Sequence, residues 1–449
     1  MTDTLDTLTS ETTELLQALI RNQCVNDGTV ESGQEDRSAK LLRDGLEGVG
    51  ADLEIFEPEP GRTSLIARYE GTDPEAPSIC LMGHTDVVPV SPEGWSRDPF
   101  GGELVDGEVW GRGAVDMLNL TSSMAVAFRH IVKSKKRYPG DIIYFAVADE
   151  EAGGKLGAEH LIDTEWDHIG CDYLLTEYGG TPVQRDDGLV VMMTTTEKGG
   201  AGRTLHIPGE PGHGSMPYGT DNALVTAAQI VTRLVDYDPG LRLDRMFSDR
   251  VKALNFPKEL EQRLLDPVAH AEAIDELPPA MARNLHSCGH VSISPNIING
   301  GEKINTIPDS VTLQLDIRIL PGDTQDDVES HLRAAIGDDL FNRVEIERTH
   351  ESEASQSSID TPLWGALVDA VHMAYPGAKV LPSMVTGGTD ARFFRKKGVP
   401  CYGAGLLSHK VGFEEFLNRF HGHDERIDVE SLRMTTQLWL DILDRLWEQ

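Results

Sequence analysis

The stretch Ser78-Ile79-Cys80-Leu81-Met82-Gly83-His84-Thr85-Asp86 shows the pattern that decides the fold: a short apolar run that ends in side chains able to bind a metal. The pattern returns in residues 141–151, which end in Asp149-Glu150-Glu151, and in residues 171–177, which end in Glu177. Such runs are typical of buried parallel strands, and open α/β sheets carry their chemistry at the carboxyl ends of strands. The sequence therefore predicts that an imidazole and several carboxylates meet at one sheet edge, where they suit a divalent metal, above all zinc.

Length and charge narrow the classes of protein. At 449 residues the chain exceeds the usual size of one hydrophobic core, so we expect two domains. Its 74 acidic and 40 basic residues give a formal net charge of −34, which repels phosphate backbones and predicts no nucleic-acid partner. A solvated acidic surface accounts for this charge, and a saline habitat is an alternative. Bound cations would neutralise part of it.

The compartment is predicted from the cysteines and the N-terminal segment. The five cysteines are irregularly spaced, and two of them lie inside apolar runs, which favours reduced thiols over a disulfide framework. Residues 1–13 are polar and acidic and lack the features of a signal peptide. No apolar stretch approaches the ~20 residues that span a membrane. We expect a soluble, cytoplasmic protein.

Hydrophobic periodicity predicts an α/β catalytic domain in two parts, residues 1–197 and 355–449, interrupted by an inserted domain, residues 198–354. The first part alternates strands with helices and contains a hairpin that turns at Asp106-Gly107. The inserted domain is predicted to follow the order β-α-β-β-α-β of a ferredoxin-like, split βαβ sandwich. Its segments are 202–207, 222–235, 290–298, 310–320, 324–336 and 343–348. Residues 240–284 read as an additional, mostly helical insertion.

Each candidate ligand also has a structural interpretation. His84 and Asp86 share one face of a strand end, so Asp86 is placed to orient an imidazole that binds metal, although an isolated pair of this kind is more often a core histidine beside a helix cap. Asp116 follows Gly111-Arg112-Gly113 and either caps the next helix or bridges two metals with its two oxygens.

The downstream candidates are less decisive by themselves. Glu150 and Glu151 are adjacent at the predicted strand end, so one can reach a metal while the other acts as a general base on a water. Glu177 is either a ligand or part of a turn. The segment His421-Gly422-His423-Asp424-Glu425 is either a ligand site or a polar surface loop. The absence of HExxH and GxSxG excludes a helix-borne zinc site of that type and a serine hydrolase of that type.

Taken together, the motifs resemble the di-zinc aminoacylase/carboxypeptidase G family, which includes acetylornithine deacetylase, succinyl-diaminopimelate desuccinylase and several dipeptidases. The matching segments occur in the family's order and cover nearly the whole chain. They are 83–89, 111–117, 149–151, 176–177, 212–217, 305–308, 387–392 and 421–425.

The resemblance implies a role for each of these residues. His84 and Glu177 would hold one Zn²⁺, Glu151 and His421 the other, with Asp116 bridging; Co²⁺ or Mn²⁺ are alternatives. Glu150 would be the general base and Asp86 the residue that orients His84. His213 would reach into the active site of a second subunit and stabilise the oxyanion, which requires a homodimer. Asn305 would contact the tetrahedral intermediate, and Arg392 would bind the free carboxylate of the substrate.

The expected activity is hydrolysis of the amide bond of a small N-acyl amino acid or a short peptide. A dipeptidase or carboxypeptidase remains the alternative within the hydrolases, and a non-catalytic binding protein on the same scaffold is the alternative outside them. The chain departs from many relatives at Leu118-Asn119, where they carry Lys-Gly. The preference for His421 over His423 rests on the spacing to Glu425.

Overall fold

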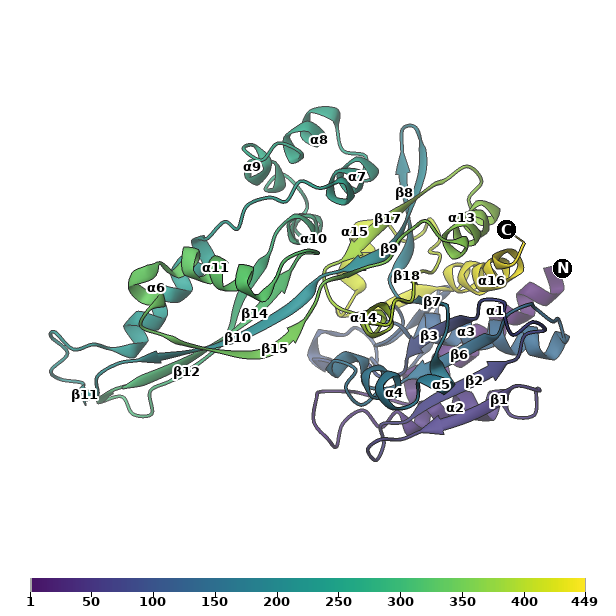
Figure 1. Ribbon diagram of the computed structural model, residues 1–449, viewed down its shortest axis with the longest axis horizontal. Coiled ribbons are helices and arrows are strands. Elements are labelled where there is room, and N and C mark those ends of the chain that lie inside the picture. The colour runs from purple at the N-terminus through teal and green to yellow at the C-terminus, as the bar shows by residue number, and fades with distance from the viewer. Residues whose placement is uncertain (1, 449) are drawn as a thin grey trace.

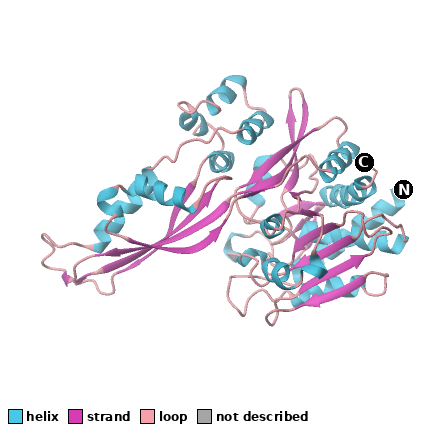
Figure 2. Ribbon diagram, in the orientation of Figure 1, coloured by secondary structure: helices cyan, strands magenta, loops and turns pink. Residues whose placement is uncertain are grey.

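The computed structural model describes residues 2–448 and contains a large mixed sheet joined to a smaller antiparallel one (Figures 1 and 2). Within these residues the large sheet has ten strands, and the chain enters it from both ends of the sequence. Its main path is β1 (Asp52–Phe56), β2 (Ser64–Tyr69), β6 (Ile142–Val147), β3 (Ile79–His84), β7 (Tyr173–Thr176), β18 (Cys401–Gly403), β9 (Gly188–Glu197) and β16 (Ser355–Gln356). Strands β8 (Gly179–Arg185) and β17 (Lys379–Val385) also pair with β9.

Helices cover both faces of this sheet, because its central strands are apolar on both sides. In β6, Tyr144 and Ala146 pack into one core and Ile143 and Phe145 into another. The first core involves α1 (Thr2–Arg21), α2 (Asp36–Leu46), α3 (Leu118–Ser134), α13 (Pro362–Ala374) and α16 (Val429–Leu446). The second involves α4 (Ala158–Thr164), α5 (Trp166–Ile169) and α14 (Ala391–Lys396). The predicted α/β class is confirmed.

Strand β3 pairs in parallel with β6 on one side and with β7 on the other, so all three strands end at the same edge of the sheet. His84 is the last residue of β3, and Glu177 follows β7 directly. A separate small sheet, β19 (Arg426–Asp428), β5 (Glu108–Trp110) and β4 (Glu103–Val105), brings the segment after His421 to the same region. Its hairpin turns at Asp106 and Gly107, both with positive φ, as the Asp-Gly pair predicts.

The inserted domain has the expected split βαβ order. Its sheet runs β12 (Ser292–Gly300), β14 (Ser310–Ile319), β10 (Gly199–Pro208), β15 (Glu345–Ser352), with every pair antiparallel. The helices α6 (Ala223–Asp236), α11 (Gln325–Ile336) and α12 (Asp338–Phe341) complete its core. At the far tip, β11 (Gly212–His213) pairs with β13 (Thr306–Ile307) (Figure 1). We propose the crossings after Glu197 and before Ser355 as the domain boundaries.

The insertion between α6 and β12 forms α7 (Arg245–Ala253), α8 (Lys258–Leu264), α9 (His270–Ile274) and α10 (Pro279–Gly289). These helices pack on β9 and β17 of the large sheet, through Val190, Met192 and Met384, and on Phe413 of α15 (Phe413–Arg419). The insertion therefore belongs by sequence to the inserted domain and by packing to the catalytic domain as well.

Two adjacent residues at the first crossing are anchored to different parts of the molecule. The buried Glu197 carboxylate accepts hydrogen bonds from the backbone and hydroxyl of Thr389 at 2.6 and 2.9 Å. The buried Lys198 ammonium donates to the carbonyls of Ser287 and His290 at 3.0 and 2.8 Å. Burial lowers the pKa of Lys198 to about 8. Hydrogen bonds therefore hold the crossing to Thr389 on one side and to Ser287 and His290 on the other.

Some elements differ from the sequence expectation. Hydrophobic periodicity predicts the first helix from about Ser10, but the helix begins at Thr2, because the acidic N-terminal segment continues the same helical face. The hairpin β8–β9 was not predicted, although Asp187-Gly188 between two apolar runs is a hairpin signal. The sequence pattern predicts a strand only at 379–381, whereas β17 continues to Val385 beside β9. Among the described residues, no helix is long and apolar enough to cross a membrane.

Candidate active site

Five side chains predicted as metal ligands converge at the carboxyl edge of β3 and β7. Among the described residues, two groups have ligand atoms within 4.8 Å of one another: His84 with Asp116 and Glu177, and Asp116 with Glu151 and His421. Asp116 belongs to both groups: its Oδ1 lies 3.1 Å from His84 Nε2 and its Oδ2 lies 2.8 Å from His421 Nε2. One carboxylate therefore lies between two imidazoles, as a bridging position requires.

The ring of His84 is fixed from its other side. Its Nδ1 lies 2.9 Å from the backbone oxygen of Asp86 and 3.5 Å from the carboxylate of the same residue. The Asp86 carboxylate also accepts hydrogen bonds from Asn26 at 2.9 Å and from the backbone of Glu151 at 3.1 Å. Asp86 thus joins the His84 strand to the turn that carries Glu151, and this second contact was not expected from the sequence.

Glu150 and Glu151 lie in a one-turn 3₁₀ segment, η2 (Glu150–Ala152), and not at a strand end. The expectation of alternating strand geometry was wrong here because Asp149, with a φ of 71°, turns the chain sharply after β6. Asp149 is held by Asn26 at 3.2 Å and by the backbone of Leu156 at 2.8 Å. Burial, reinforced by the nearby Asp390 and Glu151 carboxylates, raises the pKa of Glu150 well above its usual range.

The donor set fits divalent cations. Burial raises the pKa of Glu177 well above its usual range, with Glu150 and Asp116 adding repulsion. The Oε1 atom of Glu151 and the Oδ1 atom of Asp86 are buried without a hydrogen-bond partner. The carboxylates of this cluster outnumber its two imidazoles, and cations bound by oxygen and nitrogen donors would compensate the excess negative charge.

The choice between the two downstream histidines follows from their positions. His421 Nε2 lies 3.6 Å from Glu151 as well as 2.8 Å from Asp116. The His423 ring instead packs against Gly94, where an added Cβ would meet ring atoms at 2.2–2.5 Å. His421 is therefore the histidine that faces the cluster. The alternative that Asp116 caps a helix is not realised, because the residue before α3 is Met117 and no side chain caps that end.

Glu425 holds the segment that presents Asp116. Its fully buried carboxylate accepts hydrogen bonds from the backbones of Val115 and Asp116 at 2.7 and 3.1 Å and from Arg112 at 2.6 Å. In the sequence, Glu425 was notable only for its spacing from His421. Its role as the anchor of the Asp116 loop depends on a contact across more than three hundred positions, which no local pattern predicts.

Replacing Glu425 by Gln is expected to destabilise the fold by about 3 kcal/mol, because Arg112 would keep a buried charge without its partner. Urea unfolding of the metal-free protein measures this loss. Asp221→Asn, which breaks the exposed pair with Arg343, is the matched control and should change the midpoint far less. Equal effects of the two substitutions would contradict the anchoring role.

The substrate-contact candidates fall into two places. Arg392 is buried near the cluster, but its two terminal nitrogens donate to the carbonyls of Thr389 and Gly153 at 2.8 and 2.9 Å. Its neighbour Asp390 was missed as a candidate: both of its oxygens are buried without a partner, and burial raises its pKa to about 7. Leu118, which stands where many relatives carry Lys, packs into the core against Gly113.

His213 and Asn305 lie together at the tip of the inserted domain, where the backbone of Gly214 donates to the Asn305 carbonyl at 2.8 Å. The tip is remote from β3 and β7 of the same chain (Figure 1). The imidazole of His213 is exposed and lies 2.7 Å from the Ser215 hydroxyl. Within one chain, therefore, these two residues do not join the cluster.

Residues 80–445 match the profile of peptidase family M20/M25/M40. The chain belongs to this family. M20 relatives include aminoacylase-1 of Sus scrofa, 25% identical over 90% of this chain and 89% of the relative. Succinyl-diaminopimelate desuccinylase of Psychrobacter arcticus is 24% identical over 97% of this chain and 94% of the relative. The enzyme class predicted from the sequence, a metallo-hydrolase, is confirmed.

Solved M20 structures share the fold over the whole chain. Human carnosine dipeptidase 1 has a TM-score of 0.72 at 18% identity and covers 100% of this chain and 99% of its own. The dipeptidase Dug1p of Saccharomyces cerevisiae has a TM-score of 0.71 at 18% identity, over 99% and 97% of the two chains. The likeness therefore extends to the inserted domain as well as the catalytic domain.

Proposed function

We propose that this M20 protein hydrolyses the amide bond of a small N-acyl amino acid or of a short peptide with a free carboxylate. The observation that carries the proposal is the shared position of Asp116 between His84 and His421, with Glu151 and Glu177 on either side. We assign His84 and Glu177 to one Zn²⁺ and Glu151 and His421 to the other, with Asp116 bridging. Nitrogen and oxygen donors suit Zn²⁺, and Co²⁺ or Mn²⁺ accept the same set.

When bound, the metals supply Lewis-acid chemistry that polarises a carbonyl and lowers the pKa of water. The residues of the chain do the rest. Glu150 accepts a proton from the attacking water and returns it to the leaving nitrogen, for which a carboxylate with a raised pKa is suited. Asp86 keeps the His84 ring in place through its backbone oxygen and its carboxylate.

Arg392 is proposed to bind the free carboxylate of the substrate. Its guanidinium is buried and has no acidic ion-pair partner among the described residues, and its two backbone contacts hold it in a fixed orientation. A guanidinium held in this way loses little conformational freedom when it binds a carboxylate. The buried Asp390 directly precedes α14, the helix that carries Arg392, and lies close enough to influence it.

His213 and Asn305 are proposed to act in the active site of a second copy. Their exposed position at the tip, away from the cluster of their own chain, supports a homodimer in which each tip completes the partner's site. An imidazole and an amide are suitable donors for the oxyanion of the tetrahedral intermediate. We also propose a reducing, cytoplasmic compartment, which the five buried and unpaired cysteines support.

A substrate panel with metal control tests the proposal. Acetyl-amino acids, long-chain acyl-amino acids and dipeptides are incubated with purified protein before chelation, after chelation, and after Zn²⁺, Co²⁺ or Mn²⁺ is restored. We expect hydrolysis that chelation abolishes and a metal restores. Preference for acyl or dipeptide substrates separates the aminoacylase from the dipeptidase activity. Hydrolysis that survives complete removal of metal, or protein that binds none, would contradict the proposal, the second result favouring a binding protein.

A further inference from the structure

The turn that carries Glu150 and Glu151 ends in two glycines, which close the turn with backbone hydrogen bonds. The N–H of Gly153 donates to the Glu150 carbonyl at 2.8 Å, and the N–H of Gly154 donates to the Asp149 carbonyl at 2.6 Å. Both glycines have positive φ, 100° and 72°. The position of the Glu150 backbone therefore depends on where this glycine end of the turn is held.

The other end of the turn is held beside the strand that carries His84. The N–H of Glu151 donates to the Asp86 carboxylate at 3.1 Å. The Asp149 carboxylate accepts a hydrogen bond from Asn26 at 3.2 Å. Both contacts act on the first residues of the turn, so the glycine end needs a separate support.

That support comes from Arg392 and its neighbours. The Nη2 atom of Arg392 donates to the Gly153 carbonyl at 2.9 Å. Gly154 lies directly against Asp390 and Phe393, because an added Cβ would be 2.3 Å from Asp390 Oδ1 and 2.9 Å from Phe393 Cε2. Asp390 itself is only 1% exposed. The glycine end is therefore held by a hydrogen bond and by a contact that leaves no room for a side chain.

The guanidinium of Arg392 can hold this turn and bind a substrate at the same time. One terminal nitrogen donates to the Thr389 carbonyl and the other to the Gly153 carbonyl. A guanidinium has several further N–H donors, which remain for the substrate carboxylate. Because the guanidinium is planar and rigid, a carboxylate bound to it also fixes the direction of its bond to Gly153.

We propose that Arg392 is a positioning residue for the general base: when the substrate carboxylate binds Arg392, the contacts through Gly153 and Gly154 fix the turn that carries Glu150. The inference rests on the proposed function, which assigns the carboxylate to Arg392 and the proton transfer to Glu150. Binding energy from a part of the substrate that does not react then raises kcat as well as lowering KM. A misplacement of about 1 Å in a catalytic group can cost roughly 10²-fold in rate.

The test compares an acid of the substrate panel with its C-terminal carboxamide, first N-acetyl-methionine with N-acetyl-methioninamide. The two compounds differ only in the group that faces Arg392. Release of acetate by the metal-loaded protein gives kcat and KM for both. We expect the carboxylate to raise kcat about tenfold or more and also to lower KM. A carboxylate that lowers KM and leaves kcat unchanged overturns the inference and leaves the proposed function intact.

Gly154→Ala separates positioning from binding. The added Cβ displaces the Asp390 carboxylate from the glycine end of the turn, while Arg392 keeps its guanidinium. We expect kcat for the acid to fall about tenfold, toward that for the carboxamide, while the KM ratio of the two compounds persists. An equal loss of kcat for both compounds would show only structural damage to the turn, and the inference would be overturned.

Gly377→Ala is the matched control. Gly377 lies between α13 and β17, its φ of 76° is close to the 72° of Gly154, and an added Cβ there meets nothing within 4 Å. This variant has a similar backbone strain without the contact. It should leave the ratio of kcat values unchanged. If it lowers that ratio as much as Gly154→Ala does, backbone strain explains the effect and the positioning role is refuted.

Hydrogen exchange gives a readout that does not depend on turnover, because the bonded N–H groups of Gly153 and Gly154 exchange when the turn opens. Free methionine should slow exchange in residues 150–157 of the metal-loaded protein severalfold more than methioninamide does. Gly154→Ala should remove this difference. Equal exchange with both compounds overturns the inference. If no acid of the panel is hydrolysed, the proposed function fails, and hydrogen exchange alone supports or overturns the positioning of the turn.

Discussion

Glu150→Gln is expected to lower kcat by about 10²- to 10⁴-fold, the usual contribution of a general base, while the protein keeps its metals. The amide of Gln cannot accept a proton from water at neutral pH, yet it has nearly the same shape as the carboxylate. Glu150 belongs to neither group of converging ligand atoms, so metal content should not fall. Steady-state kinetics and metal analysis of the same preparation measure both quantities.

The control for this prediction is Glu75→Gln, an exposed glutamate in the loop before β3 that should leave kcat unchanged. A Glu150→Gln variant that retains full turnover would remove Glu150 as the base. A variant that loses its metals together with its activity would instead make Glu150 part of the ligand set, so the two measurements separate the two roles.

His213→Ala is expected to lower kcat by about 10²- to 10³-fold, the cost of one oxyanion donor, without changing metal content. The reason is its proposed position in the partner's active site. The substitution should also leave the fold intact, because the His213 side chain is exposed and its hydrogen bond is to the nearby Ser215 hydroxyl. Kinetics and thermal unfolding of the variant check both expectations.

A mixture of subunits distinguishes a role in the partner from a role in the same chain. When His213→Ala and Glu150→Gln subunits are unfolded and refolded together, one site of a mixed dimer combines an intact Glu150 with an intact His213 from the other chain. Activity should then rise well above that of either variant alone. The absence of recovery, in a mixture shown to contain mixed dimers, would contradict the exchange of His213 between subunits.

Much of the catalytic centre could be predicted from the sequence because its ligands end apolar strands. The runs before His84 and Glu177 place both residues at one sheet edge wherever those strands are parallel neighbours, as they are here. The order of the inserted domain was also predictable, since its strands and helices have clear periodicity. These features depend on local pattern, which a single sequence contains.

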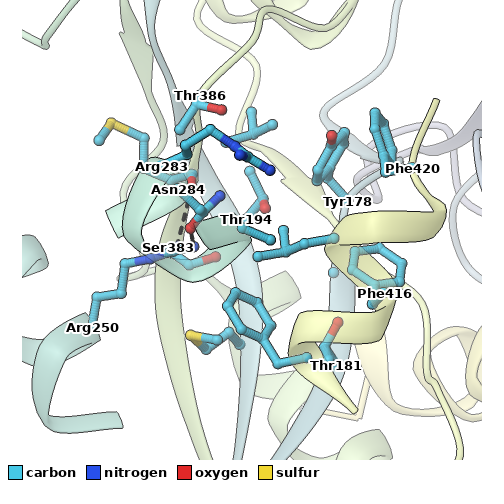
Figure 3. Close-up of a pocket in the computed structure, with 17 residues that line it drawn as sticks. Tyr178, Thr181, Thr194, Arg250, Arg283, Asn284, Ser383, Thr386, Phe416 and Phe420 are labelled. Carbon is cyan, nitrogen blue, oxygen red and sulfur yellow. Dashed lines mark hydrogen bonds between the residues drawn. The ribbon is translucent and has the colours of Figure 1, made fainter. Parts of the chain in front are cut away.

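The contacts that the sequence did not predict link distant segments. The Glu425 carboxylate binds the backbone before and at Asp116, and Asn26 binds both Asp86 and Asp149. No local signal distinguishes Glu425 or Asn26 from ordinary polar residues. The 3₁₀ turn at Glu150 depends on the left-handed conformation of Asp149, which the apolar run before it does not reveal. A cavity bordered by Tyr178 and Phe420 (Figure 3) was likewise hidden, because its walls come from four separate parts of the chain.

The neighbouring residues Glu197 and Lys198 limit how the two domains move against each other. The carboxylate of Glu197 is tied to the Thr389 loop, and the ammonium of Lys198 is tied to the end of α10 and the start of β12. Because these contacts hold two adjacent residues, a rotation of the inserted domain requires changes in the backbone torsions of Gly199-Gly200 and of the return segment before Ser355. Any remaining twist is transmitted through Glu197 to Thr389, just before the helix α14 that carries Arg392, so the angle between the domains is coupled to the position of the side chain proposed to bind the substrate.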